Sequence, residues 1–202
     1  MKNILLMSCG KSDYFVKSFN TYIKKNSLKY NLIGIDNNKK SKFFKYLNYS
    51  IKSPLIKSKS FNFFFCNLIK RFKVDFIIPF NDIDLKYLKD NFTKVSKYSK
   101  ILTPNKGLID YGLDKLKTKS LLKKLSLKYP QLFFFNKIRE NDFPIIYKGR
   151  GKKIVSTKGY TVIKNQNDLL KIKYDKNFIL EKKIEGQEYT VDIISNYKKT
   201  LI

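Results

Sequence analysis

Lys2–Met7, with the sequence KNILLM, is a short apolar run of the kind that forms a buried strand. The next segment, Tyr14–Lys25, places aromatic and aliphatic residues at helical spacing. Tyr30–Asp36 (YNLIGID) is a second apolar run. A strand, an amphipathic helix and another strand in this order predict a parallel βαβ unit.

The same alternation continues through the first half of the chain. Ser60–Arg71 predicts a phenylalanine-rich helix, Val74–Pro79 a third strand and Lys100–Leu102 a fourth. Parallel sheets need helices on both faces, so residues 1–103 are predicted to form a three-layer α/β domain. In such a domain, a ligand crevice lies beyond the carboxyl ends of the strands.

Residues 104–202 show a different order of elements. Consecutive helices are predicted over Asn105–Tyr111 and Asp114–Leu125, with Asp114 as the N-cap of the second. Beyond them we expect four strands, over Leu132–Phe135, Ile145–Lys148, Phe178–Lys182 and Tyr189–Ile194. A polar loop is expected over Gly149–Gly159 and a short helix over Asn167–Ile172. This pattern predicts a second domain, of the α+β class.

The charge of the chain is strongly positive. Lysine and arginine total 43 against 16 acidic residues, a net charge of +27, yet only Arg71, Arg139 and Arg150 are arginines. A nucleic-acid surface usually concentrates its charge and uses arginine for bidentate contacts, whereas these lysines occur in nearly every segment. The charge therefore does not predict a specific nucleic-acid partner.

Several chemistries are excluded by composition. The chain has no histidine, which rules out Ser-His-Asp and Cys-His nucleophile systems and imidazole-based zinc sites. Cys9 and Cys66 stand far apart and are expected to be free thiols. The sequence has no signal-peptide pattern and no apolar run of about 18 residues, so we expect a cytoplasmic protein without a membrane partner.

The first domain offers weak candidates for a site. The loop after the first strand has one glycine, Gly10, where a dinucleotide-binding protein carries three. Asp36 could bind a ribose, although a loop-capping role is favoured. Asn81, Asp82 and Asp84 could orient a polar substrate, and a helix N-terminus explains the two aspartates equally well.

The second domain offers a candidate phosphate site. Lys148 ends an apolar strand, and the loop after it contains Ser156, Thr157, Lys158 and Gly159. A strand-borne cation with glycine, hydroxyl and backbone N–H donors suits an anionic chain, although the spacing of a Walker A loop is absent. The alternative is a hairpin tip whose lysines share the bias of the whole chain.

Glutamates are scarce and clustered. Of the four in the chain, Glu181 lies near the end of one predicted strand, and Glu185 and Glu188 lie around Gly186 before the next. In a chain so poor in acids, this clustering indicates a site, while surface ion pairs with neighbouring lysines are the alternative.

Taken in order, these motifs resemble the ATP-grasp superfamily, specifically the carbamoyl-phosphate-synthase-like carboxylate-amine ligases. The resemblance covers essentially the whole chain and rests on I-P-x-x-D (Ile78, Pro79, Asp82), Asp114-Lys115, Phe143-Pro144 with Lys148, Ser156-Thr157-Lys158-Gly159, and E-G-x-E-Y-T-V-D over Glu185–Asp192. It implies a Rossmann-like pre-ATP-grasp domain over residues 1–103 and a partial ATP-grasp nucleotide-binding domain over 104–202, with the C-terminal part of the fold missing.

The resemblance also implies roles for individual residues. Lys115 and Lys148 would hold the phosphates of ATP, and the loop Ser156–Gly159 would close over them. Glu181–Ile184 would line the adenine through strand and hinge backbone, and Glu188 would accept hydrogen bonds from the ribose hydroxyls. These pairings are chemically sensible, because ammonium groups suit phosphates and a carboxylate suits a diol.

The activity implied is an ATP-dependent ligation. ATP phosphorylates a small-molecule carboxylate, and an amine or related nucleophile displaces phosphate from the acyl phosphate. Catalysis of this kind depends on positioning and charge neutralisation and needs no histidine. ATP and the carboxylate are the expected partners, and a homo-oligomer is compatible with the sequence.

Two departures from the family pattern lead to further expectations. The usual V-K-P is Tyr147-Lys148-Gly149 here, followed by a lysine-rich loop. Mg²⁺ is expected for the complete family fold, but its acidic and asparagine ligands are absent, so no metal ligand is assigned. We expect the 202-residue chain to be inactive by itself, as a piece of a longer ligase. The alternative is a noncatalytic nucleotide- or polyanion-binding module.

Overall fold

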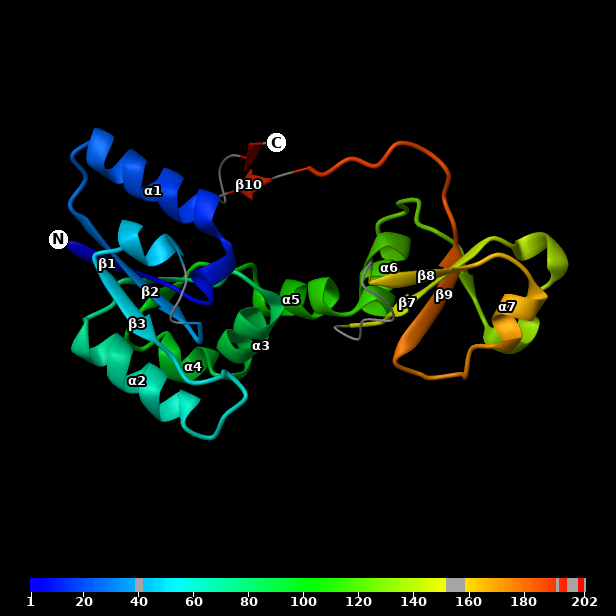
Figure 1. Cartoon of the computed structure of the whole chain (residues 1–202), viewed down its shortest axis with the longest axis horizontal. Coiled ribbons are helices and arrows are strands. Elements are labelled where there is room, and N and C mark those ends of the chain that lie inside the picture. The colour runs from blue at the N-terminus through cyan, green and yellow to red at the C-terminus, as the bar shows by residue number, and fades with distance from the viewer. Residues whose placement is uncertain (39–41, 152–158, 192, 196–199, 202) are drawn as a thin grey trace. The chain divides into compact units, whose positions relative to one another are not determined.

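The computed structural model describes residues 1–38, 42–151, 159–191, 193–195 and 200–201 (Figure 1). It divides into two compact units, Met1–Leu113 and Asp114–Ile202. The boundary at residue 103 stays a prediction for the domains. The helix α5 (Lys106–Leu113) lies in the first unit, where Lys89 of α3 (Asp82–Asp90) forms an ion pair with Asp110.

The first unit contains a five-stranded parallel sheet, which confirms the predicted α/β class. Its strands are β1 (Lys2–Leu6), β2 (Tyr30–Asp36), β3 (Tyr49–Lys52), β4 (Phe76–Ile78) and β5 (Lys100–Ile101), in the spatial order β3-β2-β1-β4-β5. From β1 to β3 the strands are added toward one edge of the sheet, and β4 and β5 are added toward the other edge. The switch point therefore lies between β1 and β4, which is where open α/β sheets place their ligand crevice.

Helices cover both faces of this sheet. The helix α1 (Asp13–Lys25) and the 3₁₀ helix Lys42–Tyr46 pack on one face, and α2 (Phe61–Arg71), α3 and α4 (Phe92–Val95) pack on the other. Figure 1 shows α1 and α2 on opposite sides of β1, β2 and β3. The side chains of each strand alternate between two separate cores as a result.

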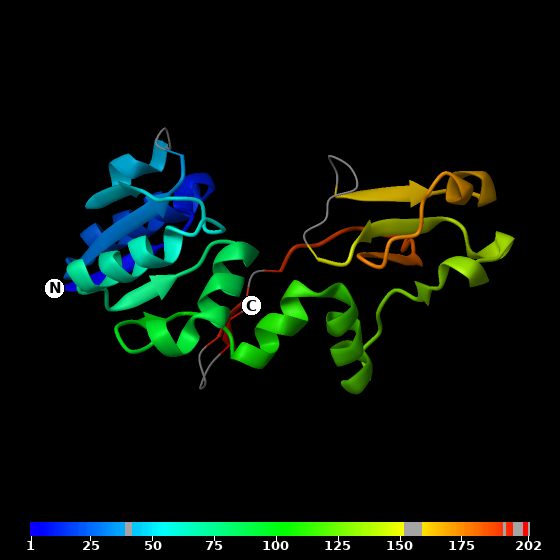
Figure 2. The same ribbon diagram turned by 90° about the horizontal axis from the view of Figure 1, so that it is seen from below.

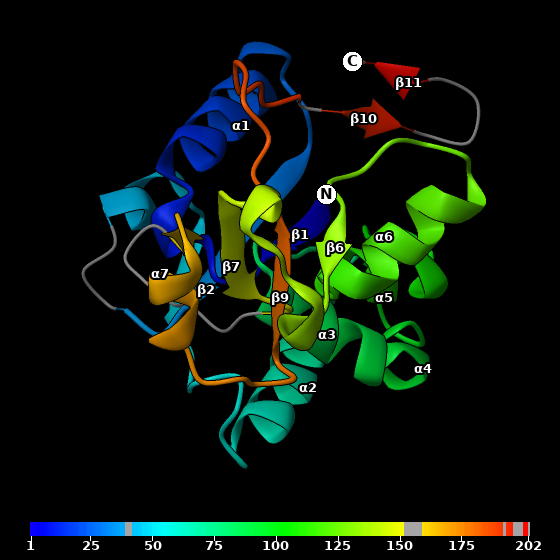
Figure 3. The ribbon, with the colours of Figure 1, turned by 90° about the vertical axis from the view of Figure 1, so that its right-hand side faces the viewer.

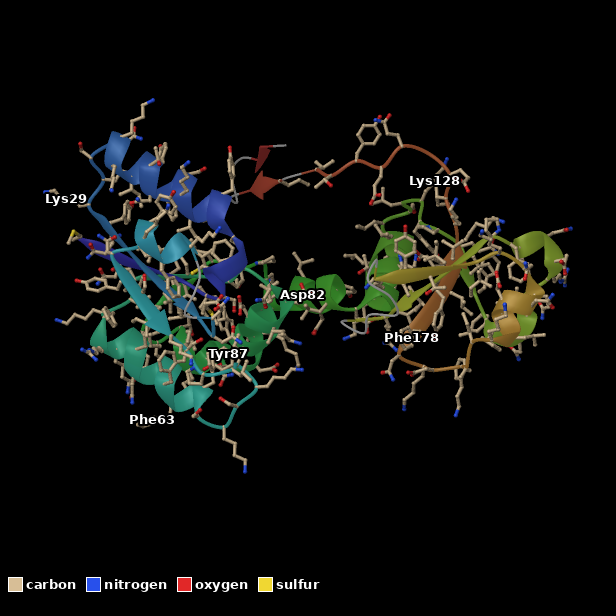
Figure 4. All side chains as sticks on the ribbon, in the orientation of Figure 1. Lys29, Phe63, Asp82, Tyr87, Lys128 and Phe178 are labelled. Carbon is tan, nitrogen blue, oxygen red and sulfur yellow. The ribbon has the colours of Figure 1, made fainter. Side chains whose placement is uncertain are left out.

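Aromatic residues fill the larger of these cores. Phe61 and Phe65, one helical turn apart on α2, are fully buried and stack with ring centroids 5.6 Å apart. The ring of Tyr87 on α3, labelled in Figure 4, meets both of them edge-on. Burial raises the pKa of the Tyr87 hydroxyl, so the group stays protonated.

The second unit contains a four-stranded antiparallel sheet. Its strands are β6 (Leu132–Phe133), β7 (Ile145–Gly149), β8 (Tyr160–Ile163) and β9 (Phe178–Lys182), in the order β6-β9-β7-β8. Its helices are α6 (Lys115–Lys124) and α7 (Gln166–Leu170), with short 3₁₀ turns at Phe135–Lys137 and Glu140–Asp142. The α+β class predicted for this half is therefore confirmed.

The two faces of this sheet have different cover. Ile145, Tyr147 and Leu180 lie on the face packed by Leu169 of α7. The Tyr147 ring stacks on the ring of Phe178, which is labelled in Figure 4, with centroids 4.8 Å apart. Alternate residues, including Lys148, lie on the opposite face. Figure 3 shows α6 and α7 on opposite sides of β7 and β9, and Figure 2 shows the same unit from below.

The strand predicted over Tyr189–Ile194 is wrong for most of its length. Residues 189–191 and 193 are irregular and exposed, and only Ile194 joins β10 (Ile194–Ser195), which pairs with β11 (Thr200–Leu201). A strand forms only where a neighbour pairs with its backbone, and alternation in sequence does not supply that neighbour. No helix in the described ranges is long and apolar enough to cross a membrane.

Candidate nucleotide-binding site

Glu181 is the centre of a charged cluster on the second sheet. It lies on the inner strand β9, opposite Leu132 of β6 and Ile146 of β7, and is only 4% exposed. Its Oε1 forms an ion pair with Lys148, which projects from β7 on the same face. Its Oε2 lies 2.7 Å from Nζ of Lys119 on α6. Two lysines from different elements thus flank one buried carboxylate.

Lys119 is a member of the cluster that sequence reasoning did not identify. It is buried, donates a hydrogen bond to the Pro130 carbonyl at 3.2 Å, and lies over the Tyr129 ring at 5.5 Å. It follows Lys115 by four residues, so both lysines lie on one side of α6. That spacing was the available indication, although it is hard to recognise in a helix where half of the residues are lysines.

An Asp114–Arg150 pair holds the start of α6 against the end of β7. The Asp114 side chain caps the helix by accepting from Leu116 N at 3.0 Å, which confirms the predicted N-cap. The Arg150 guanidinium donates to both Asp114 oxygens at 2.7–2.9 Å and holds the pKa of this carboxyl below its usual range. This bidentate pair fixes the position of Lys115, the first residue of α6.

Lys115 is thereby placed beside the start of the candidate loop. Its N–H donates to the Arg150 carbonyl at 2.9 Å, and its Nζ lies 3.4 Å from the Gly151 carbonyl. Of the predicted loop residues, Ser156, Thr157 and Lys158 lie outside the described residues. Gly159 precedes β8 with φ +78°, a conformation that favours glycine. The role of the loop stays a prediction.

The remaining predicted residues follow β9. The N–H groups of Lys182 and Lys183 donate to the carbonyls of Gln131 and Pro144, which anchors the end of the strand. Ile184 and Glu188 come after this point in irregular, exposed backbone. The structure therefore brings Lys148 and Glu181 into contact, while Ile184 and Glu188 are exposed to solvent.

Acidic residues of the first unit have structural roles. Asp36 accepts from the N–H groups of Gly10 and Asn38, both at 2.8 Å, as the loop-capping interpretation predicts. A Cβ at Gly10 would lie 2.5 Å from Asp36 Oδ2, so the close approach requires glycine. Asp84 is buried and accepts from Ser8 Oγ at 2.7 Å and from Phe80 N at 2.9 Å.

The thiols of the chain are free. Burial and the nearby charge of Asp36 raise the pKa of Cys9 to about 12, so this thiol is protonated at neutral pH and is a poor nucleophile. Across the described residues, no group of three cysteine or acidic side chains is placed to hold a metal ion.

Comparison with known proteins finds solved structures of similar fold, but no match to a family model or to a curated protein. Among solved structures, N5-carboxyaminoimidazole ribonucleotide synthetase from Thermotoga maritima aligns with TM-score 0.63 and 21% identity, over 92% of this chain and 47% of its own. The corresponding synthetase from Staphylococcus aureus gives 0.65 and 17%, over 91% and 47%.

The chain has the fold of the N-terminal portion of an ATP-grasp ligase. A biotin carboxylase domain from Hydrogenobacter thermophilus, solved with magnesium ADP and bicarbonate, aligns with TM-score 0.63 and 15% identity over 91% of this chain and 44% of its own. This chain therefore spans about half the length of the structures that it matches. At these identities the likeness concerns the fold alone.

Proposed function

We propose that the second unit binds ATP on the face of β7 and β9, as the nucleotide-binding portion of an ATP-dependent carboxylate-amine ligase that acts through an acyl phosphate. The observation that carries the proposal is the contact of Lys119 and Lys148 with one buried carboxylate, Glu181. The fold supports it, because the structural neighbours are ATP-dependent ligases.

The charges of this face suit a triphosphate. Lys115, Lys119 and Lys148 bring three ammonium groups, and Glu181 offsets only one of them. Asp114 and Arg150 neutralise each other and add no net charge. The excess positive charge attracts a polyphosphate, and lysine binds phosphate as a compact point charge.

The end of β9 supports adenine and ribose contacts. Because the N–H groups of Lys182 and Lys183 are used by Gln131 and Pro144, the N–H of Ile184 is the next along the chain to offer a purine nitrogen a hydrogen bond. Glu188 follows and supplies a carboxylate for the ribose hydroxyls. Glu181 contributes its side chain to the lysines, so its part in adenine contact is through the strand backbone.

The lysines would contribute to catalysis by binding and orientation. Ammonium groups at fixed positions orient the phosphates for transfer to a carboxylate and neutralise charge as it develops. Mg²⁺ would supply further neutralisation of the phosphates in a ligase that binds it, and among the described residues no group of three cysteine or acidic side chains lies together to hold the ion.

A second function is favoured by one observation, the net charge of +27. A noncatalytic module could bind polyanions through lysines spread over its surface. Such binding would weaken steeply with salt and would ignore the base of a nucleotide.

Titration calorimetry with ATP, GTP and tripolyphosphate at low and high salt separates the two functions. We expect ATP to bind more tightly than GTP at both salts, and Lys148→Met to weaken ATP binding about tenfold, because one charged hydrogen bond is lost. Lys123→Met, at an exposed position on α6, is the matched control and should bind ATP normally. Equal binding of all three ligands, lost together in salt, would overturn the ATP proposal in favour of the polyanion module.

A further inference from the structure

The cluster around Glu181 is unequal in its exposure to solvent. The Lys119 and Glu181 side chains are 9% and 5% exposed, whereas the Lys148 side chain is 27% exposed. Lys148 is thus the member whose ammonium can turn toward a ligand. Lys119 and Glu181 stay below the surface, where a charge without a partner is costly.

Lys119 is anchored independently of the carboxylate. Its hydrogen bond goes to the Pro130 carbonyl, and its ammonium also lies over the Tyr129 ring. Glu181 Oε2 accepts no aligned hydrogen bond from any residue that the structure describes, although Lys119 Nζ lies 2.7 Å away. The contact is therefore an electrostatic one from a cation that the backbone fixes in place.

We infer that Lys119 is a positioning residue that keeps Glu181 neutralised, so that Lys148 can leave the carboxylate and bind a nucleotide phosphate. The inference rests on the proposed function and deepens it. In the structure, Lys148 is held by Glu181, and a phosphate must compete for it. With Lys119 in place, the departure of Lys148 still leaves the buried carboxylate with one cation.

Without Lys119, Lys148 would remain in its ion pair with Glu181 and would not be available to a phosphate. In Lys119→Met the carboxylate keeps a single cation, so giving it up to a phosphate would strand a buried charge. Phosphate binding should weaken by about tenfold as a result. Adding Glu181→Gln removes the charge that holds Lys148, and the double variant should recover most of the affinity. A purely structural role for Lys119 predicts no such recovery.

The test measures dissociation constants of the full chain for ATP, tripolyphosphate and adenosine, together with melting temperatures. The variants are Lys119→Met, Lys119→Arg, the double variant Lys119→Met/Glu181→Gln, and Lys123→Met as the matched control. We expect Lys119→Met to weaken ATP and tripolyphosphate about tenfold and to leave adenosine unchanged. Lys119→Arg, which keeps the charge, should bind close to normally.

The outcomes separate the two proposals. If the unaltered chain does not bind ATP, the proposed function fails and this inference falls with it. If the unaltered chain binds ATP and Lys119→Met binds it equally well, only the inference fails. It also fails if the double variant binds no better than Lys119→Met, or if adenosine binding is lost to the same degree as ATP. Recovery of ATP and tripolyphosphate binding in the double variant supports the inference.

Discussion

Asp114 connects the start of α6 with the end of β7 through one side chain. It caps α6, which carries Lys115 and Lys119, and it pairs with Arg150 at the end of the strand that carries Lys148. The guanidinium lowers the pKa of Asp114, which means that the folded state favours the ionised carboxylate. The pair therefore stabilises the second unit in a way that depends on pH.

Replacing Asp114 with asparagine tests this charge while keeping a good helix cap. Because the folded pKa lies below the unfolded value, the stabilisation is fully present above the unfolded pKa and is lost as pH falls through the folded pKa. We expect Asp114→Asn to cost about 1 kcal/mol at pH 7, with the difference shrinking toward pH 2.5. Urea unfolding at several pH values measures it.

An exposed ion pair provides the control for this prediction. Lys86 and Asp90, four residues apart on α3, form a surface pair with side chains 69% and 50% exposed. Asp90→Asn should change the free energy of unfolding little at any pH. A difference for Asp114→Asn that stays constant from pH 7 to pH 2.5 would show that the ion pair does not act as described.

At the residue scale the sequence predicts the cluster in part. Lys148 and Glu181 stand out because one ends an apolar strand and the other is a rare glutamate, and the structure joins them. Lys119 and Arg150 could not be predicted in the same way. Lys119 is one of many lysines, and the partner of Arg150 lies 36 residues away in sequence, so only the folded chain shows the pair.

At the scale of the elements, α3 has a complete N-terminal cap. Asn81 Oδ1 accepts from Ile83 N at 2.8 Å and from Asp84 N at 3.0 Å, while Asp84 accepts in return from Asn81 N at 3.2 Å. This capping box supports the helical explanation of the acidic residues after β4. The capping residue is Asn81, one position before Asp82.

Replacing Asn81 with alanine removes the acceptor for two helix N–H groups. We expect Asn81→Ala to lower the free energy of unfolding by about 1 kcal/mol and Asn81→Ser, which keeps a capping oxygen, to lower it less. Denaturant unfolding measures both, and amide exchange in α3 localises the change. Equal stability of the alanine, serine and unaltered chains would contradict the cap.

Element prediction succeeds where apolar runs are long and fails at short edges. The buried strands β1 and β2 and the helices α1, α2 and α6 appear close to their predicted limits. The edge strands β3 and β8 were not predicted: Tyr49–Lys52 has one inward apolar residue, Ile51, and Tyr160–Ile163 adjoins the polar loop. These segments become strands because β2 and β7 pair with them, and a short stretch of sequence does not show which strand will lie beside it.

At the scale of the whole molecule, the chain forms two compact units and has a large net positive charge. We expect adenine nucleotide to bind the second unit specifically, at the sheet face that carries Lys148. A charge of +27 also predicts weak, unspecific attraction of any polyphosphate to lysines of both units. Specific binding and unspecific attraction differ in which segments of the chain the ligand protects from amide exchange.

Amide hydrogen exchange with and without ATP, at a salt concentration high enough to suppress surface attraction, tests this claim most directly. We expect ATP to slow exchange in β7, in β9 and at residues 183–184, and to leave β1–β5 of the first unit unchanged. Protection spread evenly over lysine-rich segments of both units, or confined to the first unit, would contradict the claim.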